Sequence, residues 1–235
     1  MAMHIEINSS PIILAVDTDD IDTAKRWVSV TNPYIGVFKL GLEFFIKFGQ
    51  SGVKQVQAES DKPIFLDLKL HDIPNTVAKS ALQVADLAPM FLTVHASGGR
   101  KMIQAAAENL PQSKITAVTV LTSLDQGDLN EMGAIGTPQE LAVRLAKISV
   151  SAGAKAIVCS PQEISQIRKA VGDQILIITP GVRPKDAGAS DDQKRIMDPK
   201  SAIAEGANYL VIGRPITGAT DIANAASKIL QEIKS

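Results

Sequence analysis

The chain has 235 residues, 45% of them hydrophobic and 21% charged, and its formal net charge at pH 7 is -1. This near-neutral balance is ordinary for a globular protein and argues against nucleic acid as the main partner. No apolar run reaches the roughly 18 residues of a membrane span, and the N-terminus lacks the basic start and apolar block of a signal peptide, so we expect a cytoplasmic protein without membrane contact.

Short apolar runs rich in β-branched residues alternate with stretches of helical period along the chain. The predicted strands cover residues 11–17, 34–39, 64–71, 91–95, 115–123, 156–159, 175–181 and 209–213. The predicted helices begin after Asp20 and at Gly41, then cover residues 74–87, an alanine-rich stretch to Asn109, and residues 137–152, 160–171, 199–205 and 219–234. Residues 124–136 are predicted to form an irregular insert.

Eight strands that alternate with eight helices, nearly all of the strands apolar enough to be buried on both faces, indicate a parallel sheet of the α/β class. At this length the repeats close most naturally into a (β/α)8 barrel, or TIM barrel, whose typical size is about 250 residues. A doubly wound open sheet is the second candidate. No composition break or flexible linker divides the chain, so we expect a single domain over residues 1–235.

The third predicted strand carries the densest group of charges. Side chains alternate along a strand, so Asp67 and Lys69 share one face with Phe65. Buried charges are very costly unless they are paired. Asp72 adds a second carboxylate just past the strand end, and Pro74 is suited to the first turn of a helix. The segment predicts either acid–base chemistry at the mouth of the strand or a structural ion pair with Asp72 as a helix N-cap.

In a barrel of this kind the functional site lies where the carboxyl ends of the strands meet. Polar or special residues stand at most of these ends: Asp17, Lys39, Asp67, Lys69, Asp72, His95, Thr122, Ser123, Ser160, Pro180, Gly213 and Arg214. Taken singly, Asp17 and Ser160 fit helix caps, and Lys39 fits an amphipathic side chain with a solvated tip. Because several strands deliver charge to one rim, we predict a functional site there.

The last two strands have the features of a phosphate site. Gly213 and Arg214 follow the eighth strand, where backbone N–H groups and a guanidinium suit an anion. The loops after strands seven and eight are the usual phosphate site of this fold. Residues 181–195 are too long and polar for a plain connector, which we interpret as a lid or, alternatively, as a surface excursion without that role.

The cysteine and histidine residues point to neither a disulfide nor a zinc site. Cys159 is the only cysteine, which fits a reducing compartment, and its strand-like surroundings favour a packed thiol over a nucleophile. The histidines His4, His71 and His95 have no partners at zinc spacing. We expect packing or supporting roles for His71 and His95.

The run from Asp67 to Thr76 has the form DxKxxD[IV]PxT and resembles the orotidine 5′-phosphate decarboxylase family. The DxKxxD core alone is shared with other sugar-phosphate barrels, whereas the proline and threonine make the longer motif specific. The resemblance covers essentially the whole chain, including Lys39 and residues 15–17, 94–96, 121–123, 179–183 and 212–216.

The resemblance implies a homodimeric barrel that converts orotidine 5′-phosphate to uridine 5′-monophosphate (UMP) and CO2, the last step of de novo UMP synthesis, without metal or organic cofactor. Lys69 would protonate C6 of the pyrimidine, Asp67 would lie beside the departing carboxylate, and Lys39 would hold the charge network and contact ribose. Asp72 and Thr76 would reach into the partner's site. The other implied substrate contacts are Asp17 at a ribose hydroxyl, Thr122 and Ser123 at the pyrimidine, Arg183, Gln193, Gly213 and Arg214 at the phosphate, and Pro180.

Physical chemistry agrees with these roles. Loss of CO2 from C6 leaves a carbanion that no adjacent group delocalises well, so its stabilisation has to be electrostatic. An ammonium held near C6 favours the developing charge and then supplies the proton.

Three other functions fit parts of the sequence. A Mg²⁺-dependent sugar-phosphate decarboxylase or aldolase of the same barrel superfamily would use Asp67 and Asp72 as oxygen ligands, although Lys39 on that rim repels a cation. A Schiff-base aldolase needs a neutral amine at Lys69, whereas flanking carboxylates favour the charged form. A non-catalytic nucleotide-phosphate binder would need the phosphate loops but no charge cluster.

Overall fold

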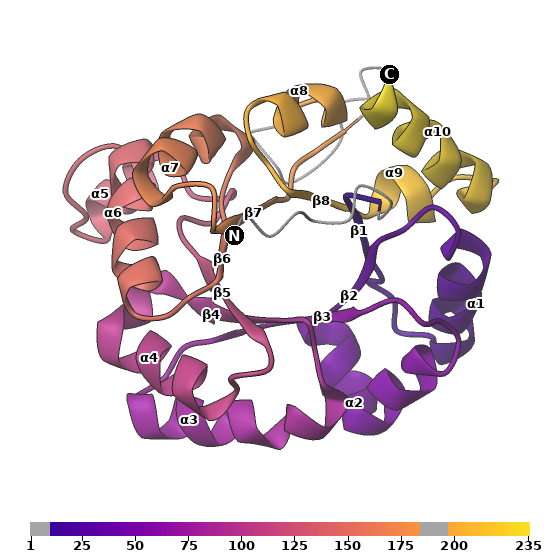
Figure 1. Ribbon diagram of the computed structural model, residues 1–235, viewed down its shortest axis with the longest axis horizontal. Coiled ribbons are helices and arrows are strands. Elements are labelled where there is room, and N and C mark those ends of the chain that lie inside the picture. The colour runs from indigo at the N-terminus through magenta and orange to yellow at the C-terminus, as the bar shows by residue number, and fades with distance from the viewer. Residues whose placement is uncertain (1–9, 184–196) are drawn as a thin grey trace.

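The computed structural model describes residues 10–183 and 197–235. In this part of the chain eight parallel strands close into a barrel in sequence order, and β8 pairs with β1 (Figure 1). The strands are β1 (Ile12–Ala15), β2 (Val37–Gly41), β3 (Ile64–Leu70), β4 (Phe91–His95), β5 (Lys114–Val118), β6 (Ala156–Val158), β7 (Leu176–Thr179) and β8 (Tyr209–Ile212). The predicted (β/α)8 barrel is confirmed, and the open sheet is excluded because β1 and β8 are paired.

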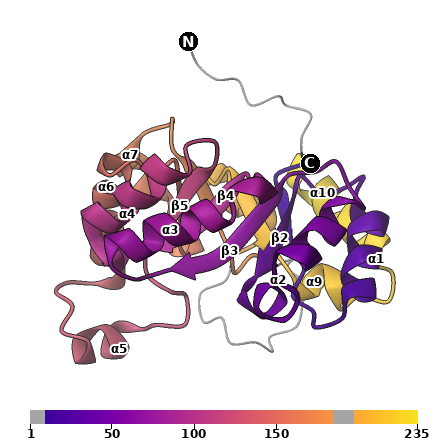
Figure 2. The same cartoon turned by 90° about the horizontal axis from the view of Figure 1, so that it is seen from below.

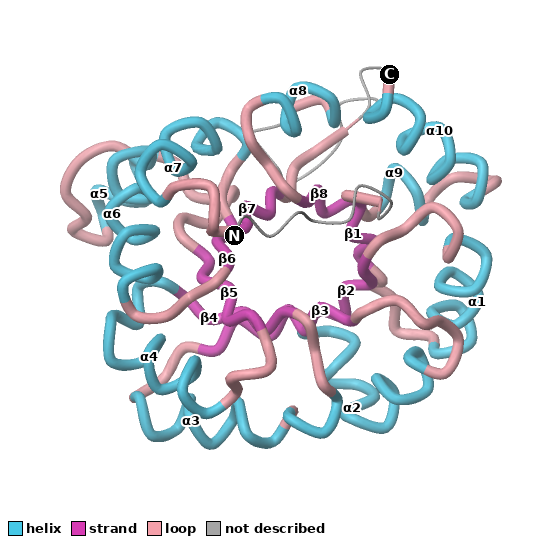
Figure 3. The backbone as a smooth tube through the Cα atoms, viewed as in Figure 1, coloured by secondary structure: helices cyan, strands magenta, loops and turns pink. Residues whose placement is uncertain are grey.

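The helices form a ring outside the barrel (Figure 3). Those that follow the successive strands are α1 (Ile21–Thr31), α2 (Leu42–Gln57), α3 (Pro74–Gln83), α4 (Gly99–Asn109), α6 (Pro138–Ser151), α7 (Ile164–Val171), α8 (Pro199–Ala204) and α10 (Ile222–Lys234). Two short helices, α5 (Gln126–Glu131) and α9 (Arg214–Thr217), and 3-10 turns at Ala85–Leu87, Ala96–Gly98 and Pro161–Glu163 complete the described elements. Over residues 10–183 and 197–235, no helix combines the length and apolar character needed to cross a membrane.

Local side-chain signals start several of the helices. The Asp20 carboxylate accepts a hydrogen bond from the Thr23 N–H at 2.8 Å, which caps α1 as predicted. Thr137 and Glu140 form a reciprocal capping box ahead of α6, with Pro138 in its first turn. Short-range chemistry of this kind explains why the helix starts were visible in the sequence.

Seven of the eight strands contribute buried side chains to an apolar cluster inside the barrel. These inward-facing residues are Ile13, Val37, Phe65, Phe91, Ala156, Ile178 and Tyr209. Phe91 lies at the centre of an edge-to-face aromatic group, with ring centroids 5.5 Å from Phe65 and 5.7 Å from Tyr209. This apolar plug blocks passage through the barrel, so the carboxyl end of the strands is left as the place for a cavity.

Several predicted segments differ from the structure; the second strand, for example, covers Val37–Gly41 instead of residues 34–39. The fifth strand ends at Val118 instead of residue 123: the Thr119 N–H and hydroxyl both donate to the Val158 carbonyl, and the chain then leaves the ladder. The insert at residues 124–136 is not wholly irregular: Asp125 caps α5, which stands away from the ring of helices (Figure 2). The closing helix begins at Ile222 behind an Asp221 cap, and α9 precedes it.

Candidate active site

A cavity of about 450 Å³ opens at the carboxyl ends of the strands. It is lined by charged and apolar residues, and most strands contribute. The predicted residues that line it are Asp17, Lys39, Asp67, Lys69, Thr122, Pro180, Arg183, Gly213 and Arg214. The structure thus brings together, in one cavity, residues from both ends of the sequence.

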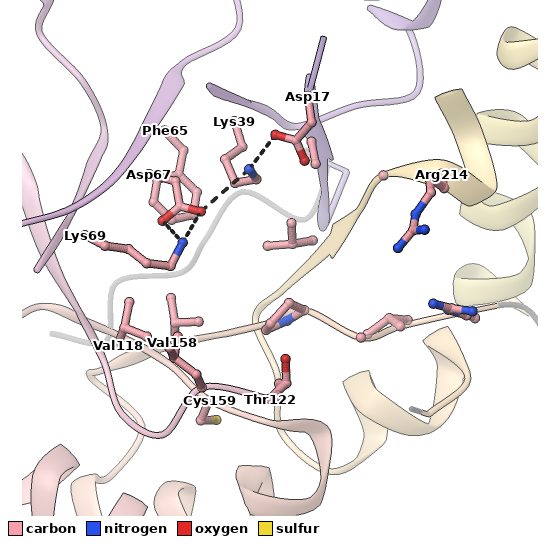
Figure 4. A pocket seen from close by; sticks show the side chains of 18 of the residues that line it. Asp17, Lys39, Phe65, Asp67, Lys69, Val118, Thr122, Val158, Cys159 and Arg214 are labelled. Carbon is pink, nitrogen blue, oxygen red and sulfur yellow. Dashed lines mark hydrogen bonds and ion pairs between the residues drawn. The ribbon is translucent and has the colours of Figure 1, made fainter. Parts of the chain in front are cut away.

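Four charged residues form a chain along one wall of this cavity (Figure 4). The Lys39 ammonium lies between two carboxylates, 3.1 Å from Asp17 Oδ1 and 3.6 Å from Asp67 Oδ2. The Lys69 ammonium donates to both oxygens of Asp67 at 2.9 Å. The order Asp17, Lys39, Asp67, Lys69 therefore alternates in sign, which makes each charge the partner of the next.

Burial and pairing act in opposite directions on the inner two groups. Burial lowers the pKa of Lys39, but the charges of Asp67 and Asp17 outweigh it, so this pKa lies above its usual value. Burial raises the pKa of Asp67, but Lys39, Lys69 and a hydrogen bond from Thr93 outweigh it, so this pKa lies below its usual value. Both groups are therefore charged at neutral pH.

Strand β3 is irregular where it presents these charges. Its pairing with β4 runs from Leu66↔Leu92 to Leu70↔Val94, so three residues of β3 stand opposite Thr93 alone. Lys69 has a φ of 47°, a left-handed conformation that is strained for a residue with a side chain. The Asp67 and Lys69 side chains nevertheless meet on the cavity side, as the alternation of the strand predicted.

The two ends of the cavity differ in character. Val118 and Val158 form an apolar wall below the Lys69 ammonium, whereas the Arg214 guanidinium lies across the cavity from Lys69 (Figure 4). Arg183 and Gly181, after β7, lie with Arg214 among the lining residues. A ligand that spans the cavity would meet a paired ammonium at one end and guanidinium groups at the other.

Three predicted site residues that the structure describes are not among the residues that line this cavity. Asp72 is exposed, and its carboxylate accepts a hydrogen bond from the Ile73 N–H at 2.6 Å; it is not the N-cap of α3. Thr76 lies in the first turn of α3, away from the lining residues, and Ser123 is exposed just outside them. Gln193 lies outside the described residues, as does most of the predicted lid.

The histidines on this rim pair with each other. The His71 and His95 rings lie 5.3 Å apart, and burial, with the nearby charges of His71 and Lys69, lowers the pKa of His95. Cys159 is buried, and burial raises its pKa well above the ordinary value, which agrees with a packed thiol rather than a nucleophile. In residues 10–183 and 197–235, no group of three or more His, Cys, Asp or Glu side chains is arranged to hold a metal ion.

Sequence reasoning missed two residues beside the charge cluster. A Cβ at Gly41 would lie 3.2 Å from both Asp17 Oδ1 and Lys39 Nζ, so only glycine leaves these groups their present positions. Thr93, with no exposed surface, contacts both Asp67 and the Lys69 backbone. Gly41 could have been noticed as a glycine at the end of a strand next to a charged site, whereas nothing in the apolar run of β4 marks Thr93.

Comparison with known proteins gives a consistent result. The family model "Orotidine 5'-phosphate decarboxylase / HUMPS family" matches residues 10–229. A protein named orotidine 5′-phosphate decarboxylase from Thermobifida fusca (strain YX) is 48% identical over 226 residues, covering 96% of this chain and 97% of the relative. One of the same name from Rhodospirillum rubrum is 45% identical, with 97% and 96% covered. The crystal structure of orotidine 5′-phosphate decarboxylase from Lactobacillus acidophilus superposes with a TM-score of 0.84 at 35% identity, covering 97% of this chain and all of the other.

Proposed function

The chain belongs to the orotidine 5′-phosphate decarboxylase / HUMPS family and is a carboxy-lyase that decarboxylates orotidine 5′-phosphate in pyrimidine synthesis; we propose that Lys69 supplies the proton that replaces the lost CO2. One observation carries this assignment. The Lys69 ammonium lines the cavity and is held by both oxygens of Asp67, so a charged proton donor has a fixed position at the apolar end of the site.

The proposed reaction has two parts that balance. The bond between C6 and the carboxylate breaks, CO2 leaves, and the electron pair stays on C6. Lys69 then gives one proton to C6, which forms UMP and a neutral amine that takes a proton back from solvent. The ammonium stabilises the developing negative charge because it is already oriented and needs no reorganisation.

Asp67 and Lys39 keep this proton donor in place. The Asp67 carboxylate binds the Lys69 ammonium, and the Lys39 ammonium binds the other side of the same carboxylate. Because Asp67 is shared, rotation of its carboxylate would break contacts with both lysines. Asp17, more than half exposed and bound to Lys39, is suited to accept a hydrogen bond from a ribose hydroxyl.

The substrate phosphate would lie at the opposite end, between the loops after β7 and β8. Arg183 and Arg214 line that end of the cavity, and guanidinium groups bind phosphate oxygens in pairs. Binding energy gained there, remote from C6, can hold the pyrimidine against Lys69.

We further propose a homodimer in which Asp72 and Thr76 complete the partner's site. Within one chain Asp72 is exposed, and its next neighbour Ile73 has 67% of its surface exposed, so this segment presents a carboxylate and an apolar side chain to a second chain. Both residues lie two to three positions after the end of β3, so a second chain packed on this segment would bring Asp72 toward the charge cluster of that chain. A cytoplasmic location is part of the proposal and is supported by the single buried thiol of Cys159.

The contacts of Asp67 disfavour the alternative function considered from the sequence, a Mg²⁺-dependent sugar-phosphate decarboxylase or aldolase. A Mg²⁺ ion at Asp67 would have to displace two ammonium groups that already occupy its oxygens. The relatives reported above are all named as decarboxylases of orotidine 5′-phosphate.

The test is the absorbance of orotidine 5′-phosphate mixed with the purified protein in EDTA. The parent protein should remove the orotate chromophore, and Lys69→Ala should be slower by about 10²- to 10⁴-fold, the usual contribution of a general acid. Lys79→Ala, an exposed lysine on α3, should keep the parent rate. Decarboxylation by Lys69→Ala at the parent rate would rule out Lys69 as the acid, and no turnover by the parent would redirect the search to sugar phosphates with Mg²⁺.

A further inference from the structure

In the irregular part of β3, the backbone N–H of Lys69 has a side-chain partner on β4. Asp67, Leu68 and Lys69 together stand opposite Thr93 of β4, so the regular ladder is interrupted there. A buried N–H that loses its ladder bond needs another acceptor, since an unpaired one is costly. The Thr93 hydroxyl oxygen fills this role and accepts from the Lys69 N–H at 2.8 Å.

The chemistry of the neighbours fixes the direction of both hydrogen bonds at Thr93. A backbone N–H only donates, and an ionised carboxylate only accepts. The hydroxyl therefore accepts from Lys69 and must donate its own proton to Asp67 Oδ1, which lies 3.0 Å away. A single oxygen thus links the strained backbone of Lys69 to the carboxylate that holds the Lys69 ammonium.

We propose that Thr93 is a positioning residue of the decarboxylation, whose hydroxyl orients Asp67 and stabilises the left-handed backbone of Lys69 so that the ammonium points into the cavity. The inference rests on the proposed role of Lys69. It goes beyond that role because Thr93 touches no substrate: it is fully buried and absent from the lining of the cavity.

The geometry explains why one hydroxyl has this influence. Asp67 Oδ1 receives two donors, Thr93 Oγ1 and Lys69 Nζ, while Oδ2 receives Lys69 Nζ and lies 3.6 Å from Lys39 Nζ. Without the Thr93 proton, the carboxylate loses one of the contacts that fix its orientation, and the two lysines remain to hold it. The same loss removes the acceptor that holds the Lys69 φ at 47°.

A neighbouring threonine provides a matched control. Thr116 of β5 stands directly beside Thr93 in the sheet register, is equally buried, and donates to the Lys114 carbonyl on its own strand. Thr93→Val and Thr116→Val both exchange a buried hydroxyl for a methyl group in the same part of the barrel. Only the first change alters a contact of the charge cluster.

The experiment measures kcat and KM for the parent, Thr93→Val, Thr93→Ser and Thr116→Val, with melting temperature and UMP affinity as checks of folding. We expect kcat of Thr93→Val to fall roughly 10- to 100-fold, the usual effect of losing a hydrogen bond to a charged group. The affinity for UMP should change by less than about threefold. Thr93→Ser keeps the hydroxyl and should retain most of kcat. Thr116→Val should match the parent in kcat.

A pH profile separates positioning from a general loss of packing. The charged and titratable groups that face Asp67 are Lys39 from β2, Lys69 from β3 and His95 from β4, with Asp17 behind Lys39. The Thr93 hydrogen bond helps to lower the pKa of Asp67, so its loss should move the acid limb of kcat/KM to higher pH in Thr93→Val and not in Thr116→Val.

The outcomes are distinct. A folded Thr93→Val with the parental kcat would overturn the positioning role. So would a loss in kcat that is equally large in Thr93→Val, Thr93→Ser and Thr116→Val. If Thr93→Val does not fold, Thr93→Ala, which also lacks the hydroxyl, takes its place: a loss in kcat that Thr93→Ser does not share supports the role, and a kcat equal to that of Thr93→Ser contradicts it. If the parent enzyme itself shows no turnover, the proposed function has failed instead.

Discussion

At the scale of single residues, Lys39 depends most on its neighbours. Its side chain is only 9% exposed, and an ammonium removed from water to this degree is stable only when it is paired. Asp67 is the less exposed of its two partners, at 13% against 55% for Asp17. The charge of Lys39 therefore depends mainly on Asp67.

Replacement of Asp67 by asparagine should change how stability depends on pH. In the parent the pKa of Lys39 is raised and that of Asp67 lowered, so both stay charged in the folded and unfolded chain, and these two groups add no slope to stability between about pH 5 and 10. In Asp67→Asn, burial dominates and the folded pKa of Lys39 falls below its unfolded value of about 10.4. The unfolded chain then binds more protons, so stability should rise from pH 7 to pH 9.5.

Urea unfolding at pH 7 and pH 9.5 measures this effect. We expect Asp67→Asn to lose about 3–5 kcal/mol at pH 7, as when one partner of a buried ion pair is removed, and to recover part of it at pH 9.5. Asp19→Asn, which breaks the exposed pair with Lys47, should leave stability nearly unchanged at both values. An equal change in stability between the two pH values in Asp67→Asn and in the parent would show that Asp17 alone sustains the Lys39 charge.

At the scale of elements, one arginine joins the end of α7 to the strands next to it. Arg168 donates to the carbonyls of Gly172, Ile175 and Gly206 at 2.7–2.9 Å and to Asn208 Oδ1 at 2.6 Å. Asn208 Oδ1 also accepts from the Ile177 N–H, so the network connects α7 with the starts of β7 and β8. These contacts lie at the amino ends of the strands, opposite the cavity.

Arg168→Lys should therefore lower stability without changing catalysis. Lysine keeps the charge but lacks the planar fork that reaches four acceptors, so we expect a loss of about 2 kcal/mol in the free energy of unfolding. The kcat/KM at a temperature where the variant is folded should stay near the parent value, because this end of the barrel serves stability. Lys169→Gln, an exposed neighbour on α7, is the control. A fall in kcat/KM in folded Arg168→Lys would contradict the separation of the two ends.

Elements defined by local signals could be predicted from the sequence, whereas features that depend on distant residues could not. The order of strands and helices followed from local signals, such as the Asp20 and Thr137 caps and the apolar strand runs. The irregularity of β3 could not be predicted, because the acceptor that stabilises the Lys69 backbone comes from Thr93, 24 residues later. The fifth strand was drawn too long because the apolar pattern continues past Val118 into residues such as Val120 that line the cavity rather than join the ladder.

At the scale of the whole molecule, apolar packing and charged groups occupy different parts of the barrel. Aromatic rings fill the inside around Phe91, while the carboxyl ends of the strands carry the charge cluster and the two arginines. The site residues on strand ends could be predicted because this fold places them on one rim. Asp72 and Thr76 differ, since they do not line the cavity of their own chain, and the role proposed for them requires a second chain.

Mixing two inactive variants tests that dependence on a second chain. Lys69→Ala lacks the proposed acid but keeps Asp72, and Asp72→Asn keeps the acid but lacks the residue that would complete the partner's site. In a mixed dimer, the site with Lys69 receives an intact Asp72 from the other chain, while the second site lacks both. Random exchange makes half of the dimers mixed, so about a quarter of the sites should be intact.

The measurement is decarboxylation rate after the two variants are mixed and given time to exchange subunits, for instance by brief dilution and reconcentration. We expect each variant alone to be slow and the mixture to approach a quarter of the parent rate per site. A mixture of Lys69→Ala with the double variant carrying both changes offers no intact site and should stay slow. If the first mixture is no faster than the sum of its parts although exchange has been verified, Asp72 acts within its own chain, and the exposed segment after β3 needs another explanation.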